Sequence, residues 1–494
     1  MRMQRPAVLR LAGLCVAVAA FWTAYVQLTF VGFSGDPLTY TEPARHFARG
    51  AGVVTNNLFP AQVAGYRQDF QFPVAYLQHG PLAPMFTGYA YRIFGEKDWV
   101  PLFVSFLFTF LTGLVMYALA LNFCSERGAL LSVSLFWTNY GILESNVHSL
   151  SDPPFILFIT CGVFCLFKLS RASRSLRWAA AAGLFLGVAT ATRLAGQTYW
   201  AGFLACAYWL SGDWRAAAAL ATVAAACLAP LAAYNHAAAG VYFYSPGWYM
   251  LLWSPSYPGT SAAMSYLDLT SLQVLLAYPR DFAQKMVTGP LYAINRFVED
   301  AHSPYLMAAA AFSLFSSLGP ARSLSVVLWL IFAPVFAFLA VYSAGAVHYL
   351  NPLLPLFCIT VVLFLSRFAE NNGWRGNWLW LGVAVFCWAF FSGTALAIKA
   401  EWKSRPGRRA SYEDEKALGA FIAARTPPGM VIYTDSPLML AWHAERPAIN
   451  LPARIKDARP LFAHKPPGAF LLTTNRLPSE DYDQFFYDTF HERK

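Results

Sequence analysis

The stretch LFVSFLFTFLTGLVMYALAL (residues 102–121) decides the fold class, because its twenty residues include no charged side chain. An α-helix of about 20 apolar residues crosses the roughly 30 Å hydrocarbon core of a membrane. LAGLCVAVAAFWTAYVQLTF (11–30) and WLWLGVAVFCWAFFSGTALA (378–397) have the same character. Of the 494 residues, 57% are hydrophobic and only 13% are charged, about half the charged fraction of a typical soluble domain. The sequence therefore predicts a mainly α, polytopic transmembrane helical bundle.

Apolar runs of this kind predict about eleven spans. They lie near residues 9–30, 101–122, 128–143, 153–169, 177–194, 197–211, 214–235, 303–318, 323–342, 350–366 and 377–398. Basic residues gather in the short loops on one side, which is typical of the cytoplasmic side. We therefore expect a cytoplasmic N-terminus, with the long regions 31–100, 236–302 and 399–494 on the other side. The basic residues of these loops account for much of the net charge of +10, so a nucleic-acid partner is not expected.

The last part of the chain changes character. SYEDEKALGAFIAART (411–426) predicts an amphipathic helix, and MVIYTD (430–435), PAINLP (447–452) and AFLLTTN (469–475) predict strands separated by helices. Strands that alternate with helices indicate a small α/β domain with a partly parallel sheet. We therefore divide the chain into a membrane domain, 1–398, and an extracytoplasmic α/β domain, 399–494. The eight cysteines lie in or beside apolar segments, so neither a disulfide framework nor a zinc site is indicated.

The first polar segment after a span, SGDPLTYTEPARHFARG (34–50), holds the first candidate site residues. Asp36 followed by Pro37 is typical of a helix start, so Asp36 either caps a surface helix or acts as a functional carboxylate at the membrane boundary. Tyr40 recurs one helical turn later on the same side. Further along, His79 lies among aromatic and charged residues that suit either sugar and phosphate binding or an ordinary aromatic belt.

Candidate residues also lie near the ends of later spans. Asp152 stands directly before two prolines and an apolar span, where it is either an N-cap or a second functional carboxylate. Arg193 lies near the end of a span, where it either pairs with a carboxylate or phosphate or snorkels to the surface. His348 and Tyr349 lie at the mouth of the tenth span. Together these residues would line a cavity with acidic groups on one side and cationic donors on the other.

Five short motifs carry a resemblance to a known family. They are GDPLTYTEPARHFARG (35–50), HGPLAPMF (79–86), SDPPFILF (151–158), HYLNPLLPL (348–356) and RPAIN (446–450). In this order along about eleven spans they resemble the GT-C superfamily of integral-membrane glycosyltransferases. The resemblance is to the branch of bacterial lipid A aminoarabinose transferases and protein O-mannosyltransferases, and as topology it covers nearly the whole chain.

The resemblance implies a function and roles for these residues. The enzyme would sit in the bacterial cytoplasmic membrane and move a sugar from a polyprenyl-phosphate donor to a lipid, glycan or protein acceptor, with inversion at the anomeric carbon. Asp36 would activate the acceptor and Asp152 would be a second acidic residue, while Tyr40, His79, Arg193, His348 and Tyr349 would bind substrate or lipid phosphate. No organic cofactor is implied, and a divalent metal stays open.

The chain departs from the family pattern in three places. Asp36 has no adjacent acidic partner, and His79 and His348 replace residues that are usually cationic. Phosphate binding would then fall to Arg193 or to Arg280, Lys285 or Arg296 in the long loop. Two other functions stay open, a transporter or flippase of lipid-linked sugars and an inactive scaffold. The lack of a sequence repeat and the charges at span ends favour an enzyme over a transporter.

Overall fold

The structure is a computed structural model. It describes residues 5–63, 65–66, 70–148, 151–171, 176–242, 266, 273, 276–300, 321–342, 347–371, 377–452 and 455–473. Within these ranges the side chains of residues 292–300, 339–349 and most of 368–389 are not described.

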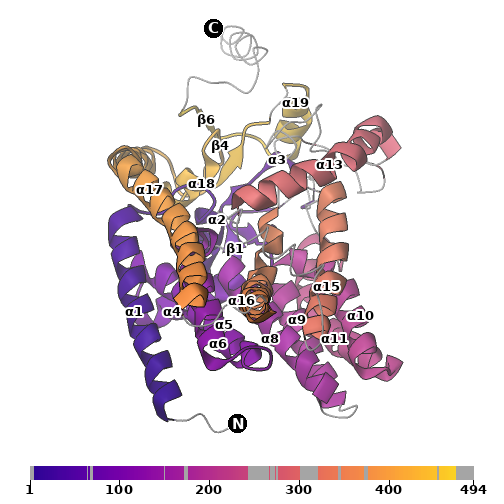
Figure 1. The fold of residues 1–494 in the computed structure, drawn as a ribbon. Helices are drawn as coiled ribbons and strands as arrows, with labels where there is room; N and C mark the ends of the chain where they lie inside the picture. Colours follow the sequence, from indigo (N-terminus) through magenta and orange to yellow (C-terminus); the bar gives the residue numbers. More distant parts are fainter. Residues whose placement is uncertain are drawn as a thin grey trace, which may run out of the picture.

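A bundle of apolar helices makes up most of the molecule (Figure 1). In the described part of the chain, five helices are long and apolar enough to cross a membrane: Pro6–Thr29, Trp99–Ala120, Asp152–Arg171, Trp214–Ala239 and Leu350–Arg367. They correspond to α1 (Arg5–Thr29), α5 (Trp99–Ala120), α8 (Asp152–Arg171), α11 (Trp214–Ala239) and the η4–α16 stretch (Val347–Leu353, Leu354–Asn371). Shorter apolar helices are α9 (Leu176–Thr192) and the Arg322–Phe338 part of α15 (Ala321–Tyr342). The predicted helical membrane bundle is confirmed.

Several predicted spans take a different form in the structure. The single span predicted at 128–143 is wrong, because it divides into α6 (Glu126–Trp137) and α7 (Tyr140–Val147). The break occurs at Asn139, whose side chain accepts a hydrogen bond from the backbone N–H of Ile142 and so starts a new helix. The span predicted at 197–211 begins with a 3₁₀ turn, η1 (Leu194–Tyr199), before α10 (Trp200–Ser211). The span predicted at 303–318 lies outside the described residues.

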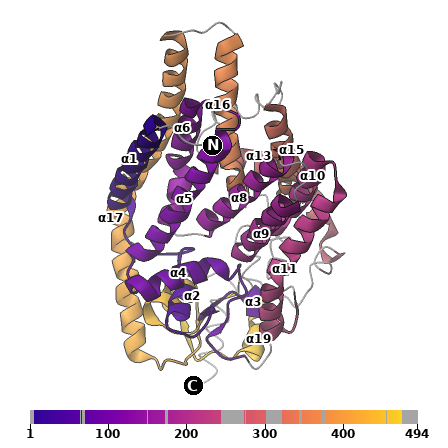
Figure 2. The same cartoon turned by 90° about the horizontal axis from the view of Figure 1, so that it is seen from below.

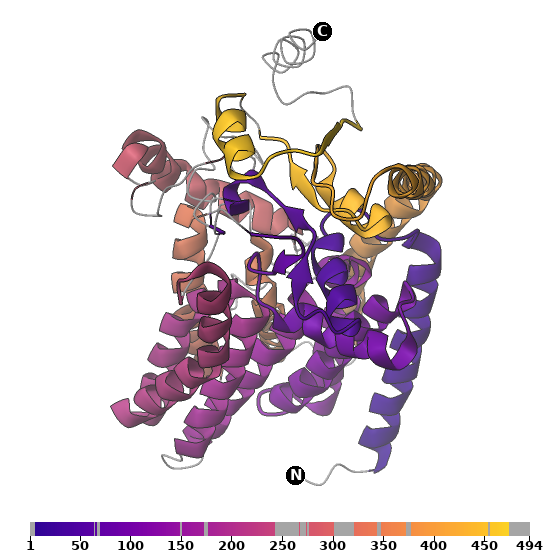
Figure 3. The same cartoon turned by 180° about the vertical axis from the view of Figure 1, so that it is seen from behind.

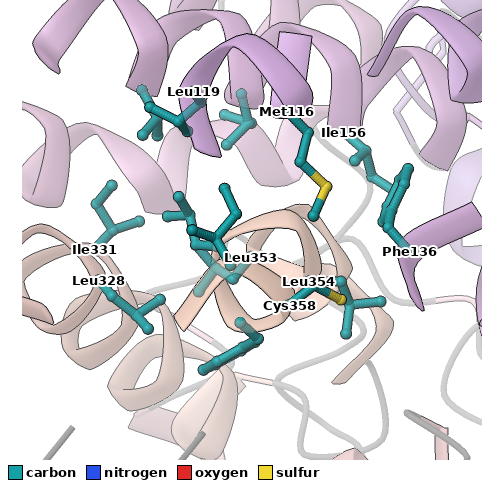
Figure 4. Close-up of a cluster of buried hydrophobic side chains, with 14 of the residues drawn as sticks. Met116, Leu119, Phe136, Ile156, Leu328, Ile331, Leu353, Leu354 and Cys358 are labelled. Carbon is teal, nitrogen blue, oxygen red and sulfur yellow. The ribbon is translucent and has the colours of Figure 1, made fainter. Parts of the chain in front are cut away.

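The bundle core lies where α5, α6 and α8 meet α15 and α16. Figure 4 shows Met116, Phe136, Ile156, Leu328 and Leu354 from these elements packed together, all of them buried. Elsewhere in the bundle, small residues let helices approach closely. A Cβ on Gly183 of α9 would lie 2.3 Å from the backbone oxygen of Leu220 in α11. Small residues at helix contacts are typical of membrane bundles.

A small sheet caps one end of the bundle. Its strand order is β2-β5-β4-β6, from β2 (Asn57–Leu58), β5 (Ala448–Asn450), β4 (Ile432–Thr434) and β6 (Ala469–Leu471), and all three pairings are parallel. Around it lie α18 (Pro437–Met439), the π-helical turn η5 (Leu440–Ala444) and α19 (Ile455–His464). The predicted C-terminal α/β arrangement is therefore present, with an edge strand, β2, that the sequence did not reveal.

The first polar region lies between the bundle and the C-terminal elements (Figure 3). It contains α2 (Leu38–Ala48), α3 (Pro60–Val63), α4 (Leu82–Phe94) and the antiparallel pair β1 (Val54–Thr55) and β3 (Val74–Ala75). Amphipathic α13 (Pro279–Asp300) lies at the same end of the molecule. The predicted division at residue 398 stays a prediction. The structure places that position inside one long helix, α17 (Asn377–Arg425), which runs beside α1 (Figure 2).

Candidate functional site

Asp152 and Arg193 form a buried ion pair. Asp152 begins α8, and Arg193 follows α9 in an extended conformation at the break before η1. Arg193 Nη1 lies 2.6 Å from Asp152 Oδ2, and the two side chains are 7% and 1% exposed. Arg193 Nη1 also donates a hydrogen bond of 3.2 Å to Ser151 Oγ. A charged pair this deep in an apolar bundle is costly when one partner is removed, because the other charge is left buried and unpaired.

This geometry decides two of the alternatives left open by the sequence. Snorkelling of Arg193 is wrong, because its side chain points into the bundle and is buried. Capping by Asp152 is also wrong, because neither of its carboxylate oxygens makes a hydrogen bond within the described residues. Pro153 and Pro154 suit the first turn of α8, since the backbone N–H groups there have no partner within the helix.

Tyr40 and His79, from separate elements of the first polar region, form a stacked pair. Their ring centroids lie 5.1 Å apart at an interplanar angle of 26°. Next to His79, Gly80 lies directly against the end of α9, where a Cβ would be 2.2 Å from the Ala191 backbone oxygen. Because Arg193 begins the segment just after Thr192, this contact brings the stacked pair to the neighbourhood of the Asp152–Arg193 pair.

Tyr76 is a residue of this neighbourhood that sequence reasoning missed. Its side chain is 1% exposed, and its hydroxyl has no hydrogen-bond partner among the described residues. Burial raises the pKa of Tyr76 well above its ordinary value, Tyr40 and Glu42 raise it further, and Arg193 opposes them. The phenol is thus neutral and close enough to Arg193 to interact electrostatically. In an aromatic-rich loop, the sequence offered no signal that separates Tyr76 from its neighbours.

Asp36 lies one helical turn before Tyr40 and is exposed. The prediction that it caps the following helix is wrong, because α2 begins at Leu38 and the capping position is Pro37, without a side-chain hydrogen bond. The backbone N–H of Thr39 donates instead to the backbone oxygen of Asp36, at 3.0 Å. No ion pair or hydrogen bond of its carboxylate is found within the described ranges. Asp36 therefore presents an accessible carboxylate between Ser34 and Pro37, both of which line a cavity.

The other acidic residue of this segment, Glu42, is a structural residue. It is 3% exposed, and its carboxylate accepts hydrogen bonds from Thr55 Oγ1 (2.7 Å) and Asn56 N (2.9 Å) and contacts His46 Nε2 at 2.9 Å. These contacts hold α2 against the β1–β2 segment. Glu42 is not placed to act as a free base.

Basic residues of the same segment join α2 to the C-terminal elements. Arg49 forms a two-bond pair with Glu96, each bond 2.8 Å, and lies 3.1 Å from Glu445. The Arg45 guanidinium lies 3.5 Å from the ring centroid of Trp442 and donates to the Trp442 backbone oxygen at 3.0 Å. The motif ARHFARG is therefore used for docking, which fixes the position of α2 and of the residues before it.

The remaining predicted residues are placed only in part. His348 and Tyr349 belong to η4, and their side chains are outside the described set. The backbone of η4 packs against α8, the helix that Asp152 begins. Of the alternative phosphate ligands, Arg280 is exposed, Lys285 is buried with its pKa lowered to about 8 by burial, and the Arg296 side chain is not described. No group of three His, Cys, Asp or Glu side chains that could hold a metal is found among the described residues.

Comparisons with known proteins agree with this architecture. Residues 78–235 match the family model of dolichyl-phosphate-mannose-protein mannosyltransferase, a segment that contains His79, Asp152 and Arg193. A comparison with curated proteins finds no significant match in sequence.

Two groups of solved structures share the fold. ArnT from Cupriavidus metallidurans bound to undecaprenyl phosphate is 13% identical, with a TM-score of 0.59 over 97% of this chain and 90% of ArnT. The Archaeoglobus fulgidus oligosaccharyltransferase AglB, in complex with an inhibitory peptide and a dolichol-phosphate, is also 13% identical, with a TM-score of 0.53 over 88% of this chain. The same archaeal enzyme with Zn and sulfate gives a TM-score of 0.56 at 14% identity. This chain covers 64% and 62% of those two archaeal chains. The chain thus has the GT-C fold of integral-membrane glycosyltransferases, as its motifs predicted.

Proposed function

We propose that this chain is an inverting glycosyltransferase that moves a sugar from a polyprenyl-phosphate donor to a lipid, glycan or protein acceptor on the outer face of the membrane. The observation that carries the proposal is the buried Asp152–Arg193 pair beside the stacked Tyr40 and His79 rings. An arginine at this depth beside aromatic rings suits a ligand that joins a sugar to a phosphate.

The leaving group of such a reaction is a lipid phosphate, and its developing charge needs a fixed cationic donor. Arg193 supplies planar N–H groups whose orientation is held by Asp152 and Ser151. Preorganised donors in a site that excludes water stabilise charge better than mobile ones. ArnT bound to undecaprenyl phosphate and AglB bound to dolichol-phosphate support a polyprenyl phosphate as the carrier.

Asp36 is the proposed base that accepts the proton of the acceptor nucleophile. It is the predicted carboxylate that remains exposed, whereas Asp152 is occupied by Arg193. Attack on the anomeric carbon from the face opposite the leaving phosphate would give inversion. The donor set around Asp152 does not fit a metal ion, because its nearest charged partner is a cation. No step is therefore assigned to a metal.

Turnover of a polyprenyl-phosphate sugar by the full chain in nanodiscs tests the proposal, with release of polyprenyl phosphate as the readout. Asp36→Asn should lower the rate by about 10²–10⁴-fold, the usual contribution of a general base. Asp98→Asn, a change at another exposed carboxylate of the same region, should leave it unchanged. Equal turnover of wild type and Asp36→Asn would remove Asp36 from this role. Movement of the lipid-linked sugar across sealed vesicles without bond cleavage would instead indicate a transporter.

A further inference from the structure

A cavity of about 400 Å³ lies where α1 ends, α7 ends and a middle turn of α17 passes. Its wall combines aromatic rings, hydroxyl groups and cationic groups. Those used below are Phe30, Phe33, His148, Arg408, Ser411 and Tyr412. None of the residues of the Asp152–Arg193 neighbourhood lines it, whereas Ser34 and Pro37, which flank Asp36, do.

Arg408, in the wall of this cavity, has a hydrogen-bond donor that no described residue uses. Its Nη2 donates to the backbone oxygens of Thr29 (3.1 Å) and Glu401 (2.9 Å), which fixes the guanidinium in place. Its Nε is buried and makes no hydrogen bond with any described residue. No described carboxylate lies within ion-pair distance of it. An arginine with a buried donor left unused and no counter-ion favours an anionic occupant.

Two carboxylates of α17, Glu401 and Glu415, already have hydrogen-bond partners. The side chain of Glu401 accepts hydrogen bonds from the hydroxyls of Tyr25 and Tyr140. Glu415 accepts a hydrogen bond from Ser34 Oγ at 2.8 Å. Neither carboxylate therefore neutralises the charge of Arg408.

The position of the cavity points to a lipid. The candidate span of α1 ends at Thr29, and Phe30 is the next residue, so the cavity opens at the level where the hydrocarbon ends. α17 runs beside α1 here (Figures 1 and 2). Between residues 399 and 409, α17 carries two lysines and three arginines against one glutamate. On the proposed topology this basic run faces the extracytoplasmic side, where the positive-inside rule gives no reason for it.

We propose that this cavity binds the phosphate-bearing headgroup of an anionic membrane lipid. Arg408 contacts the phosphate, while His148, Ser411 and the Tyr412 hydroxyl bond to the polar groups of the headgroup. Phe30 and Phe33 pack against the glycerol end of the acyl chains. The inference rests on the proposed membrane placement but not on glycosyl transfer.

Native mass spectrometry of the purified full chain with added phosphatidylglycerol or phosphatidylcholine tests this site, with no sugar donor present. Wild type should retain phosphatidylglycerol in preference to phosphatidylcholine. Arg408→Gln should weaken phosphatidylglycerol binding by about tenfold to hundredfold, the usual effect of losing a charge-assisted hydrogen bond. Arg409→Gln is the matched control, because Arg409 is the exposed neighbour in the same basic run and does not line the cavity.

A second variant fills the cavity and keeps Arg408. Gly407 lines the cavity inside α17, and a Cβ there would meet no atom within 4 Å. Gly407→Phe should therefore fold, since glycine is a poor residue in a helix interior, and should abolish phosphatidylglycerol retention. Equal retention of both lipids, or equal loss in Arg408→Gln and Arg409→Gln, would overturn the proposal. Full competition by free glycerol 1-phosphate would also overturn it, by showing a site for a soluble anion.

Discussion

Gly80 lies so close to Ala191 that a Cβ on the glycine would be 2.2 Å from the alanine backbone oxygen and 2.6 Å from the carbonyl carbon of Thr192. This contact joins the first polar region to the end of α9. It sets the distance between the Tyr40–His79 pair and Arg193, so the arrangement of the candidate site depends on a residue without a side chain.

Gly80→Ala should therefore damage both the fold and the site. The neighbouring atoms belong to the backbone and cannot rotate away, so we expect a loss of about 1–3 kcal/mol in stability, typical of overpacking. Turnover should fall further than this loss explains, because His79 moves away from Arg193. Thermal unfolding and turnover in nanodiscs measure the two effects. Gly13→Ala is the control, since a Cβ at Gly13 meets nothing within 4 Å. Unchanged turnover in a folded Gly80→Ala protein would show that the contact does not position the site.

Variants of the Asp152–Arg193 pair can show whether the pair contributes to stability, to turnover or to both. Arg193→Met leaves the carboxylate of Asp152 buried without its cation, which should cost about 3–5 kcal/mol of stability. The double variant Asp152→Leu with Arg193→Met removes both charges and should recover most of that stability, because an apolar pair of similar size avoids the desolvation cost. Thermal unfolding of the three proteins measures the recovery.

Turnover of the same proteins then decides the role of Arg193. The proposed function requires the double variant to stay inactive although it is stable, since the lipid phosphate has lost its cationic donor. A stable and fully active double variant would show that the pair serves only the fold.

The sequence predicted those features that depend on local composition. The uncharged run at 102–121 became α5, and the strands near residues 432, 448 and 469 became a parallel sheet. Pairing of Arg193 with a carboxylate or phosphate was one of two alternatives, because an arginine at membrane depth needs a partner or a route to the surface, and the sequence did not identify Asp152 as the partner. The burial of Arg193 and the identity of its partner depend on how the helices pack, which hydropathy does not reveal.

What the sequence missed depends on contacts between distant segments. Strand β2 has only two residues, Asn57 and Leu58, and it forms because Ala448 and Ile449 offer a free edge. The sequence offered no reason to assign Glu42 a different role from Asp36, yet hydrogen bonds from Thr55 and Asn56 make Glu42 a structural residue. Asp36 failed to cap α2 because Pro37 takes the capping position. None of these three outcomes can be predicted from the spacing of apolar and polar residues along the chain.

Arg446 of the RPAIN motif caps the C-terminal end of α17. Its Nη2 donates to the backbone oxygens of Ala423 (2.7 Å) and Thr426 (2.8 Å), and its Nη1 donates to Ala444 O at 3.0 Å. A cation at a helix C-terminus pairs the last carbonyls and complements the helix dipole. Arg446→Ala should destabilise the C-terminal elements by about 1–3 kcal/mol, because buried carbonyls lose their donors.

Hydrogen exchange localises this effect. Amides of residues 422–426 should exchange faster in Arg446→Ala, and Arg446→Lys should rescue little, because a single ammonium cannot reach three carbonyls held in a planar pattern. Arg459→Ala, at an exposed arginine of α19, should leave these amides unchanged. Full protection of residues 422–426 in Arg446→Ala would contradict the capping role.

His443 should make the fold sensitive to acid. Burial lowers the pKa of His443 to about 4, and the nearby cations Arg45 and Lys416 contribute. In the unfolded chain a histidine has a pKa of about 6.5. Between about pH 6.5 and 4 the unfolded state binds a proton that the folded state does not, so stability falls as the pH falls through this window. His443→Asn removes this proton uptake, and its melting temperature should fall less between pH 7 and pH 4.5 than that of wild type. His236→Asn, at an exposed histidine of α11, should follow wild type. A parallel pH dependence of wild type and His443→Asn would show that other groups control acid stability.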